Sequence, residues 1–142
     1  NAGALVASSN RRPVAVLLRT SSARGDEASI NGAPEPAQTW LVLPSLPPSG
    51  GKASLTIQNP GRTLVTVAIT LIGAGGIVPA PSLASVEVLP GRTAEVPLAS
   101  IAGVRPVSAL LTTTHGTFVA AGASILTTGA GFAATLGLPM KR

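Results

Sequence analysis

Apolar and polar residues alternate along most of this chain, which is the pattern of β-strands with one buried face. The segment 52–58 places Ala53, Leu55 and Ile57 on one face and polar residues on the other. The segment 63–71 repeats this alternation with β-branched residues, which suit a pleated sheet. Further strands are predicted at 39–43, 83–89, 93–98, 106–114, 117–126 and 132–138. No segment of helical length has helical periodicity, so the pattern predicts an all-β protein.

The phase of the alternation also predicts which side chains form the core. On each strand the buried face is the one that gathers the aliphatic residues. The predicted core consists of Leu55, Ile57, Val65, Val67, Ile69, Val86, Val88, Val107, Ala109, Val119 and Ile125.

The tetrapeptide PGRT occurs twice, at 60–63 and 90–93, each time between two predicted strands. Proline fixes φ at the first corner of a turn and glycine supplies a positive φ at the second, which predicts a type II turn. A type II turn does not match the twist of a tight two-residue hairpin, so at least one copy is predicted to join two facing sheets. Short, regularly spaced strands with Gly/Pro turns therefore indicate an antiparallel β-sandwich.

The N-terminal part of the chain resembles its C-terminal part. Residues 4–15 (ALVASSNRRPVA) align without a gap to residues 109–120 (ALLTTTHGTFVA). This predicts that residues 1–38 are an extra N-terminal β-hairpin and linker, equivalent to the closing hairpin of a preceding unit, and that residues 39–142 are a whole β-sandwich. The segment 21–38 is polar and contains glycine and proline, which indicates a loop or linker. Chance similarity between strands of such biased composition is the alternative.

The composition of the chain limits the kinds of binding partner that can be expected. Charged residues make up 11% of the chain, against about 25% in typical domains, and cysteine is absent. The net charge of +5 comes from scattered basic residues with no interleaved aromatic side chains, so no nucleic-acid partner is predicted. The uncharged segment 63–86 is interrupted by threonine, glycine and proline, so no membrane span is predicted.

Candidate catalytic groups are few. His115 is the only histidine, and His115-Gly116 is typical of a hairpin turn. Glu87 and Glu95 flank the second PGRT and would be neighbours across a hairpin, but they alternate with valines, which predicts outward, solvated carboxylates unsuited to glycoside hydrolysis. No catalytic, cofactor-binding or metal-binding residue is predicted, no cofactor is expected, and the protein is predicted not to be an enzyme.

Two kinds of binding or modification site can be named. Trp40 is a candidate sugar-stacking residue, and its alternative is a core tryptophan with a satisfied indole N–H. Clustered threonines are candidate O-glycosylation sites, and their alternative is ordinary outward strand residues. These threonines are Thr112, Thr113, Thr114, Thr127 and Thr128.

The strands and turns around both PGRT motifs also carry a resemblance. The segments 55–71 and 86–98, together with Trp40–Pro44 and Phe118–Ser124, resemble immunoglobulin-like modules of bacterial surface proteins. More closely, they resemble a family of uncharacterised secreted proteins of actinobacteria. The resemblance covers residues 40–140 and implies an immunoglobulin-like β-sandwich that is secreted or at the cell surface. It transfers no catalytic residue.

These observations predict a non-enzymatic extracellular structural module. Its N-terminal hairpin has an apolar face that needs a partner, which favours head-to-tail assembly of copies by β-strand addition into a homo-oligomer or fibre. The alternative is a carbohydrate-binding module that uses Trp40 on cell-surface glycans. The predicted assembly residues are Leu5, Val14, Val16 and Leu18.

Overall fold

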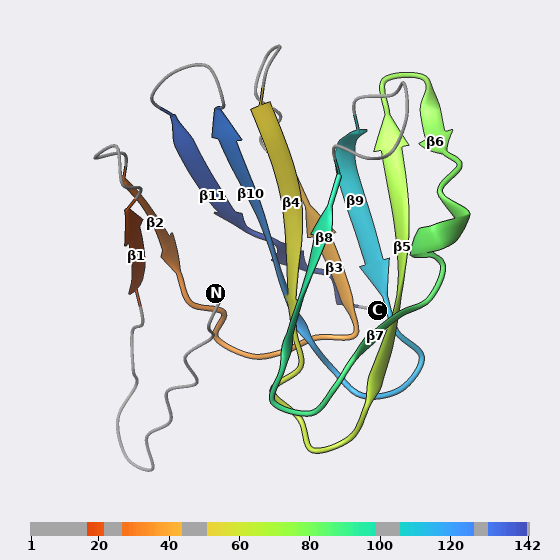
Figure 1. Ribbon diagram of the computed structural model, residues 1–142. Helices are drawn as coiled ribbons and strands as arrows, with labels where there is room; N and C mark the ends of the chain where they lie inside the picture. The colour runs from red at the N-terminus through yellow and green to blue at the C-terminus, as the bar shows by residue number, and fades with distance from the viewer. Residues whose placement is uncertain (1–16, 22–26, 44–50, 99–105, 127–130, 142) are drawn as a thin grey trace.

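The computed structural model describes residues 17–21, 27–43, 51–98, 106–126 and 131–141. Two antiparallel sheets enclose a common core, and a separate two-stranded sheet lies beside them (Figure 1). The only other regular element within these ranges is a single 3₁₀ turn, η1 (Pro81–Leu83). The predicted all-β sandwich is confirmed.

The first sheet has four strands in the order β11-β10-β4-β8. The two central strands are the longest, and their register places Ala120 opposite Ile57 and Gly122 opposite Leu55. The strands are β11 (Phe132–Leu136), β10 (Val119–Leu126), β4 (Gly51–Gln58) and β8 (Thr93–Pro97).

The second sheet has six strands, in the order β12-β3-β9-β5-β6, with β7 also paired to β5. β9 lies at its centre, between β3 and β5. The strands are β12 (Leu138–Pro139), β3 (Thr39–Val42), β9 (Pro106–Thr112), β5 (Val65–Gly73), β6 (Gly76–Val78) and β7 (Val86–Val88).

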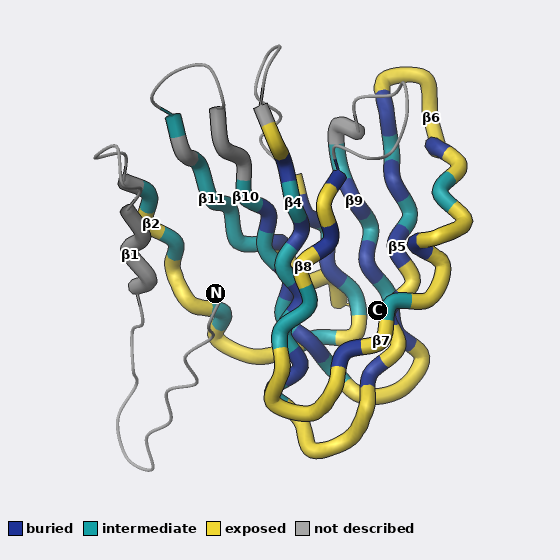
Figure 2. Tube along the Cα trace, viewed as in Figure 1, coloured by how far each residue is buried: buried dark blue, intermediate teal, exposed yellow. Residues whose placement is uncertain are grey.

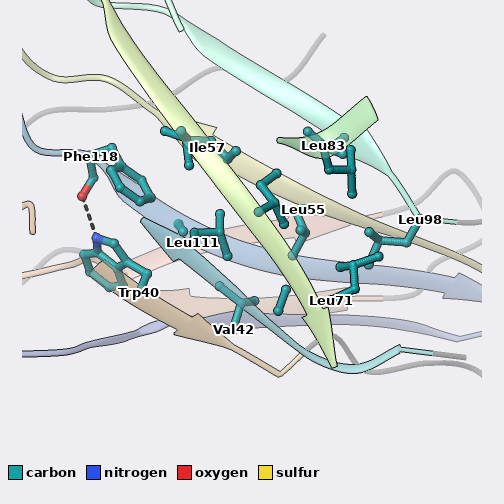
Figure 3. Close-up of a cluster of buried hydrophobic side chains, with 14 of the residues drawn as sticks. Trp40, Val42, Leu55, Ile57, Leu71, Leu83, Leu98, Leu111 and Phe118 are labelled. Atoms are coloured by element: carbon teal, nitrogen blue, oxygen red, sulfur yellow. Dashed lines mark hydrogen bonds between the residues drawn. The ribbon is translucent and has the colours of Figure 1, made fainter. Parts of the chain in front are cut away.

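The core lies between the two sheets, on the faces that the alternation predicts (Figures 2 and 3). Val86 and Val119 are half-buried and pack against it, whereas the side chains of Val107 and Ile125 lie outside the described residues. The other predicted core residues are all buried: Leu55, Ile57, Val65, Val67, Ile69, Val88 and Ala109. The predicted register is therefore correct on β4, β5, β7 and β9. On β10 it is wrong by one residue, because the residues buried there are Ala120 and Gly122, on the opposite face from Val119.

Both PGRT segments join one sheet to the other. The first leads from β4 into β5, and the second from β7 into β8. In the second copy Gly91 has φ of 65° and the Arg92 N–H donates to the Leu89 carbonyl oxygen at 3.0 Å, as the predicted turn requires. In the first copy Gly61 has no positive φ, and its N–H donates to the Asn59 side-chain oxygen at 2.9 Å. The first PGRT is an Asx turn, so the type II prediction is wrong there.

Asn59 connects the two PGRT arches, which are the segments 60–63 and 90–93 that each cross from one sheet to the other. Its backbone N–H donates to the Arg92 carbonyl oxygen at 3.0 Å, and its own carbonyl accepts from the Gly91 N–H at 2.9 Å. Its side-chain amide donates to the carbonyl oxygens of Thr63 at 2.7 Å and Val88 at 2.9 Å. Asn59 therefore holds together two neighbouring arches at one end of the sandwich.

Two local predictions are wrong. The turn at His115 is not a hairpin, because β9 and β10 belong to different sheets and residues 113–118 cross between them. The predicted linker 21–38 contains a strand, β2 (Glu27–Asn31). Residues 73–76 form the tight turn of a β5–β6 hairpin in which Gly76 has φ of 113°.

The C-terminal strand changes sheets at one residue, Gly137. β11 belongs to the four-stranded sheet and β12 to the six-stranded sheet. Gly137 is buried between them, and its N–H donates to the Ala120 carbonyl oxygen at 2.9 Å. A Cβ here would lie 2.9 Å from that oxygen and 3.0 Å from Cε3 of Trp40. Only glycine lets the chain cross so close to the core.

Candidate functional site

The N-terminal region forms a small sheet of its own against the sandwich. β1 (Leu17–Ser21) pairs antiparallel with β2, and β2 lies beside β11 (Figure 1). Ala28 and Ile30 on β2 are half-buried, whereas Ser29 between them is exposed. Among the described strands β11 pairs only with β10, so β2 packs beside it without joining its ladder.

The structure describes only part of the predicted assembly face. Leu18 lies in β1, where its partner in the register is Ile30, and its side chain is outside the described residues. Leu5, Val14 and Val16 also lie outside the described residues. The paired strands that the structure describes, 17–21 and 27–31, lie within the predicted hairpin and linker 1–38. The segment 4–15 of the alignment lies outside the described residues.

Trp40 belongs to the core. Its exposed fraction is 0%, and its indole N–H donates to the Phe118 carbonyl oxygen at 2.6 Å (Figure 3). The alternative prediction, a core tryptophan with a satisfied N–H, is confirmed. A buried indole has no ring face left for a sugar, so the structure contradicts a sugar-stacking role for Trp40.

The candidate glycosylation threonines differ in accessibility. Thr113 is buried, and its hydroxyl donates to the His115 carbonyl oxygen at 2.9 Å, so O-glycosylation there is contradicted. Thr112 is half-buried on β9, and Thr114 is exposed with its hydroxyl 3.0 Å from Nδ1 of His115. Thr127 and Thr128 lie outside the described residues.

The two glutamates near the second PGRT do not form a pair. Glu87 lies on β7, opposite Thr66 of the six-stranded sheet, and Glu95 lies on β8, opposite Thr56 of the four-stranded sheet. Both are exposed. The arch between them separates the carboxylates onto different sheets, so the geometry of a glycosidase pair is not built here.

Buried polar groups in the described part of the chain serve the fold. Every buried side-chain nitrogen or oxygen there has a hydrogen-bond partner. Within the same ranges no three His, Cys, Asp or Glu side chains gather where a metal ion could bind. None of the helical segments described is long and apolar enough to cross a membrane.

Sheet order, core and arches together define a β-sandwich module. Residues 4–138 match a family of unknown function, DUF5719, and the chain belongs to this family. Among solved structures, the crystal structure of Thermotoga maritima 1070 is similar, with a TM-score of 0.58 and 18% identity over 74% of this chain and 96% of that one. At this identity the similarity shows the fold alone. No protein with a curated description matches the sequence.

Sequence reasoning missed the two residues that organise the sandwich most directly, Asn59 and Gly137. Asn59 could have been found, because asparagine before Pro-Gly commonly bonds its own backbone two residues on. Gly137 gave a weaker indication, a single glycine inside an apolar run, which is typical of a close backbone approach.

Proposed function

We propose that this protein is a non-enzymatic structural module, secreted or at the cell surface, whose copies assemble head to tail by β-strand addition. The observation behind the proposal is the placement of the β1–β2 sheet beside β11. A two-stranded sheet is marginal in water by itself. An edge strand such as β11 presents unpaired backbone groups to an added strand. Each module therefore carries both an edge and a hairpin suited to extend one.

Head-to-tail assembly follows if the hairpin of one copy extends the β11 edge of the next. Such a contact uses two different surfaces, so it need not close into a ring and can continue as a fibre. The low share of charged residues, 11%, opposes association only weakly. The resemblance to immunoglobulin-like modules of secreted actinobacterial proteins supports an extracellular location.

Chemical cross-linking between two chains that carry different affinity tags tests this proposal. Single introduced cysteines can direct the cross-link, because the sequence has no cysteine of its own. One chain carries Ser29→Cys on β2 and the other Ala134→Cys on β11. After mixing and treatment with a bis-maleimide, we expect cross-linked dimers that contain both tags.

The control mixture pairs Ser29→Cys with Glu87→Cys, an exposed position in the six-stranded sheet. Equal yields of dimer from the two mixtures would sink the proposal. So would a cross-link that forms only inside a single chain carrying both Ser29→Cys and Ala134→Cys.

A further inference from the structure

The outer face of the six-stranded sheet carries many aliphatic side chains. Trp40 and Val42 on β3 are buried, so Leu41 between them points outward. Leu41 lies opposite Leu138 on one side and Leu110 on the other. Leu138 is 57% exposed. A row of leucines therefore crosses three neighbouring strands on the outside of the sandwich.

The rows of residues on either side of these leucines are also uncharged. On one side Ile72 lies opposite Ile77, which is 75% exposed. On the other side Thr112 lies opposite both Thr39 and Ala68. Over these three rows of β12, β3, β9, β5 and β6, the sheet face has no charged residue.

The four-stranded sheet has a different outer face. This face carries Lys52, Thr56 and Gln58 from β4 and Glu95 from β8. This is the mixture of charged and polar side chains that a solvated sheet face normally has. On the described outer face of the six-stranded sheet the one charged side chain is Glu87 on β7, which lies beyond the three uncharged rows.

We propose that this uncharged face binds the same face of a second copy of the chain. The chain has a net charge of +5, so most other contacts between copies would bring like charges together, whereas this face brings none. Its polar groups are threonine and serine hydroxyls, which both donate and accept hydrogen bonds and so complement their own copies. Aliphatic rows on a twisted sheet can pack against an equal sheet, as the two sheets of the core do.

The size of the face sets the strength of the dimer. Five strands about 4.8 Å apart and three rows about 7 Å apart cover roughly 400 Å² on each copy. The pair would bury about 800 Å², below the roughly 1,200–2,000 Å² of stable complexes. A weak dimer that forms at high concentration is expected.

Sedimentation equilibrium from about 10 μM to about 1 mM tests the proposal on the full chain. The face variant is Ile77→Lys with Leu138→Lys. The control variant is Leu64→Lys with Leu89→Lys, which changes residues 45% and 61% exposed near the PGRT arches and adds the same charge. We expect the wild type and the control to dimerise alike, and the face variant to have at least a tenfold higher Kd. A wild type that stays monomeric throughout, or two variants with equal Kd, would overturn the proposal.

A second measurement separates this contact from hairpin-mediated assembly. Thr112→Cys lies on β9, the central strand of the uncharged face, and Thr56→Cys lies on β4, a central strand of the other sheet. With a bis-maleimide, Thr112→Cys should give homodimers in much higher yield than Thr56→Cys. Equal yields would overturn the face-to-face dimer, whatever the Ser29 and Ala134 pair shows about the hairpin.

Discussion

The side-chain amide of Asn59 donates a hydrogen bond to the carbonyl oxygen of Val88 at 2.9 Å, across 29 residues of sequence. The same amide nitrogen holds the Thr63 carbonyl oxygen, and the side-chain oxygen holds the Gly61 N–H. Asn59 itself is fully buried. One side chain thus satisfies backbone groups at both PGRT arches.

The substitution Asn59→Asp tests the hydrogen bonds of this side chain with little change of its size. Aspartate keeps the oxygen that accepts from Gly61 but replaces the donor amide, so the carbonyl oxygens of Thr63 and Val88 face a carboxylate. Leaving buried groups unsatisfied costs about 1–3 kcal/mol each. We expect the free energy of unfolding in urea to fall by about 3 kcal/mol. The control is Asn31→Asp at an exposed position of β2, and equal losses in the two variants would contradict the role of Asn59.

Gly91→Ala tests the second arch. Gly91 has φ of 65° and no atom within 4 Å of an added Cβ, so the cost of alanine is one of backbone conformation alone. A non-glycine residue in this region costs about 1–2 kcal/mol. Gly91→Asn should lose less stability, because asparagine tolerates the left-handed conformation. Thermal unfolding of the three proteins checks the order, and asparagine as costly as alanine would refute it.

Val67→Asp tests the core. Val67 is fully buried on β5, and an unpaired buried charge costs several kcal/mol, comparable with the ~5–15 kcal/mol stability of a domain. We expect the variant to be unfolded by circular dichroism at neutral pH. Ala68→Asp, the exposed neighbour on the same strand, should fold. A folded Val67→Asp protein would show that the assigned face of β5 is wrong.

Gly137→Ala tests the point where the chain changes sheets. The new Cβ would lie 2.9 Å from the Ala120 oxygen and 3.0 Å from Trp40 Cε3. Overpacking of this kind costs about 1–3 kcal/mol. Unfolding can be followed by the fluorescence of Trp40, the single tryptophan. Gly75→Ala is the control, since nothing lies within 4 Å of its Cβ, and its stability should be nearly that of the wild type.

Strand existence, and register where apolar and polar residues alternate, could be predicted from the sequence. β4 and most of β5 alternate, and a slip of one residue would expose most of their aliphatic side chains, so the burial of Leu55 and Val67 could be predicted directly. The register of β10 could not be predicted, because its central residues are alanine, glycine and serine. The position of each strand within the two sheets could not be predicted from the sequence. A turn such as His115-Gly116 satisfies local chemistry equally in a hairpin or between sheets, and only pairing with distant strands decides which.

The local sequence pattern also could not predict the short strands or the burial of Trp40. β6 has three residues and β2 lies in a polar segment, so neither has enough alternation to stand out. Trp40 is buried because Phe118 and Gly137 close over it from more than 70 positions away. The surface charge pattern of the six-stranded sheet likewise depends on which strands become neighbours.

The pairing of distant strands has a kinetic consequence. Trp40 donates its indole N–H across 78 residues, and apart from the β5–β6 and β10–β11 pairs the strands paired in the two sheets are not consecutive in the chain. Loop-closure entropy must be lost before such contacts form, and sandwiches with this topology fold in milliseconds to seconds. The β5–β7 pairs close loops of 19 to 23 residues and the Asn59–Val88 contact closes one of 29. The region around the two arches is therefore the place where folding of the sandwich can nucleate.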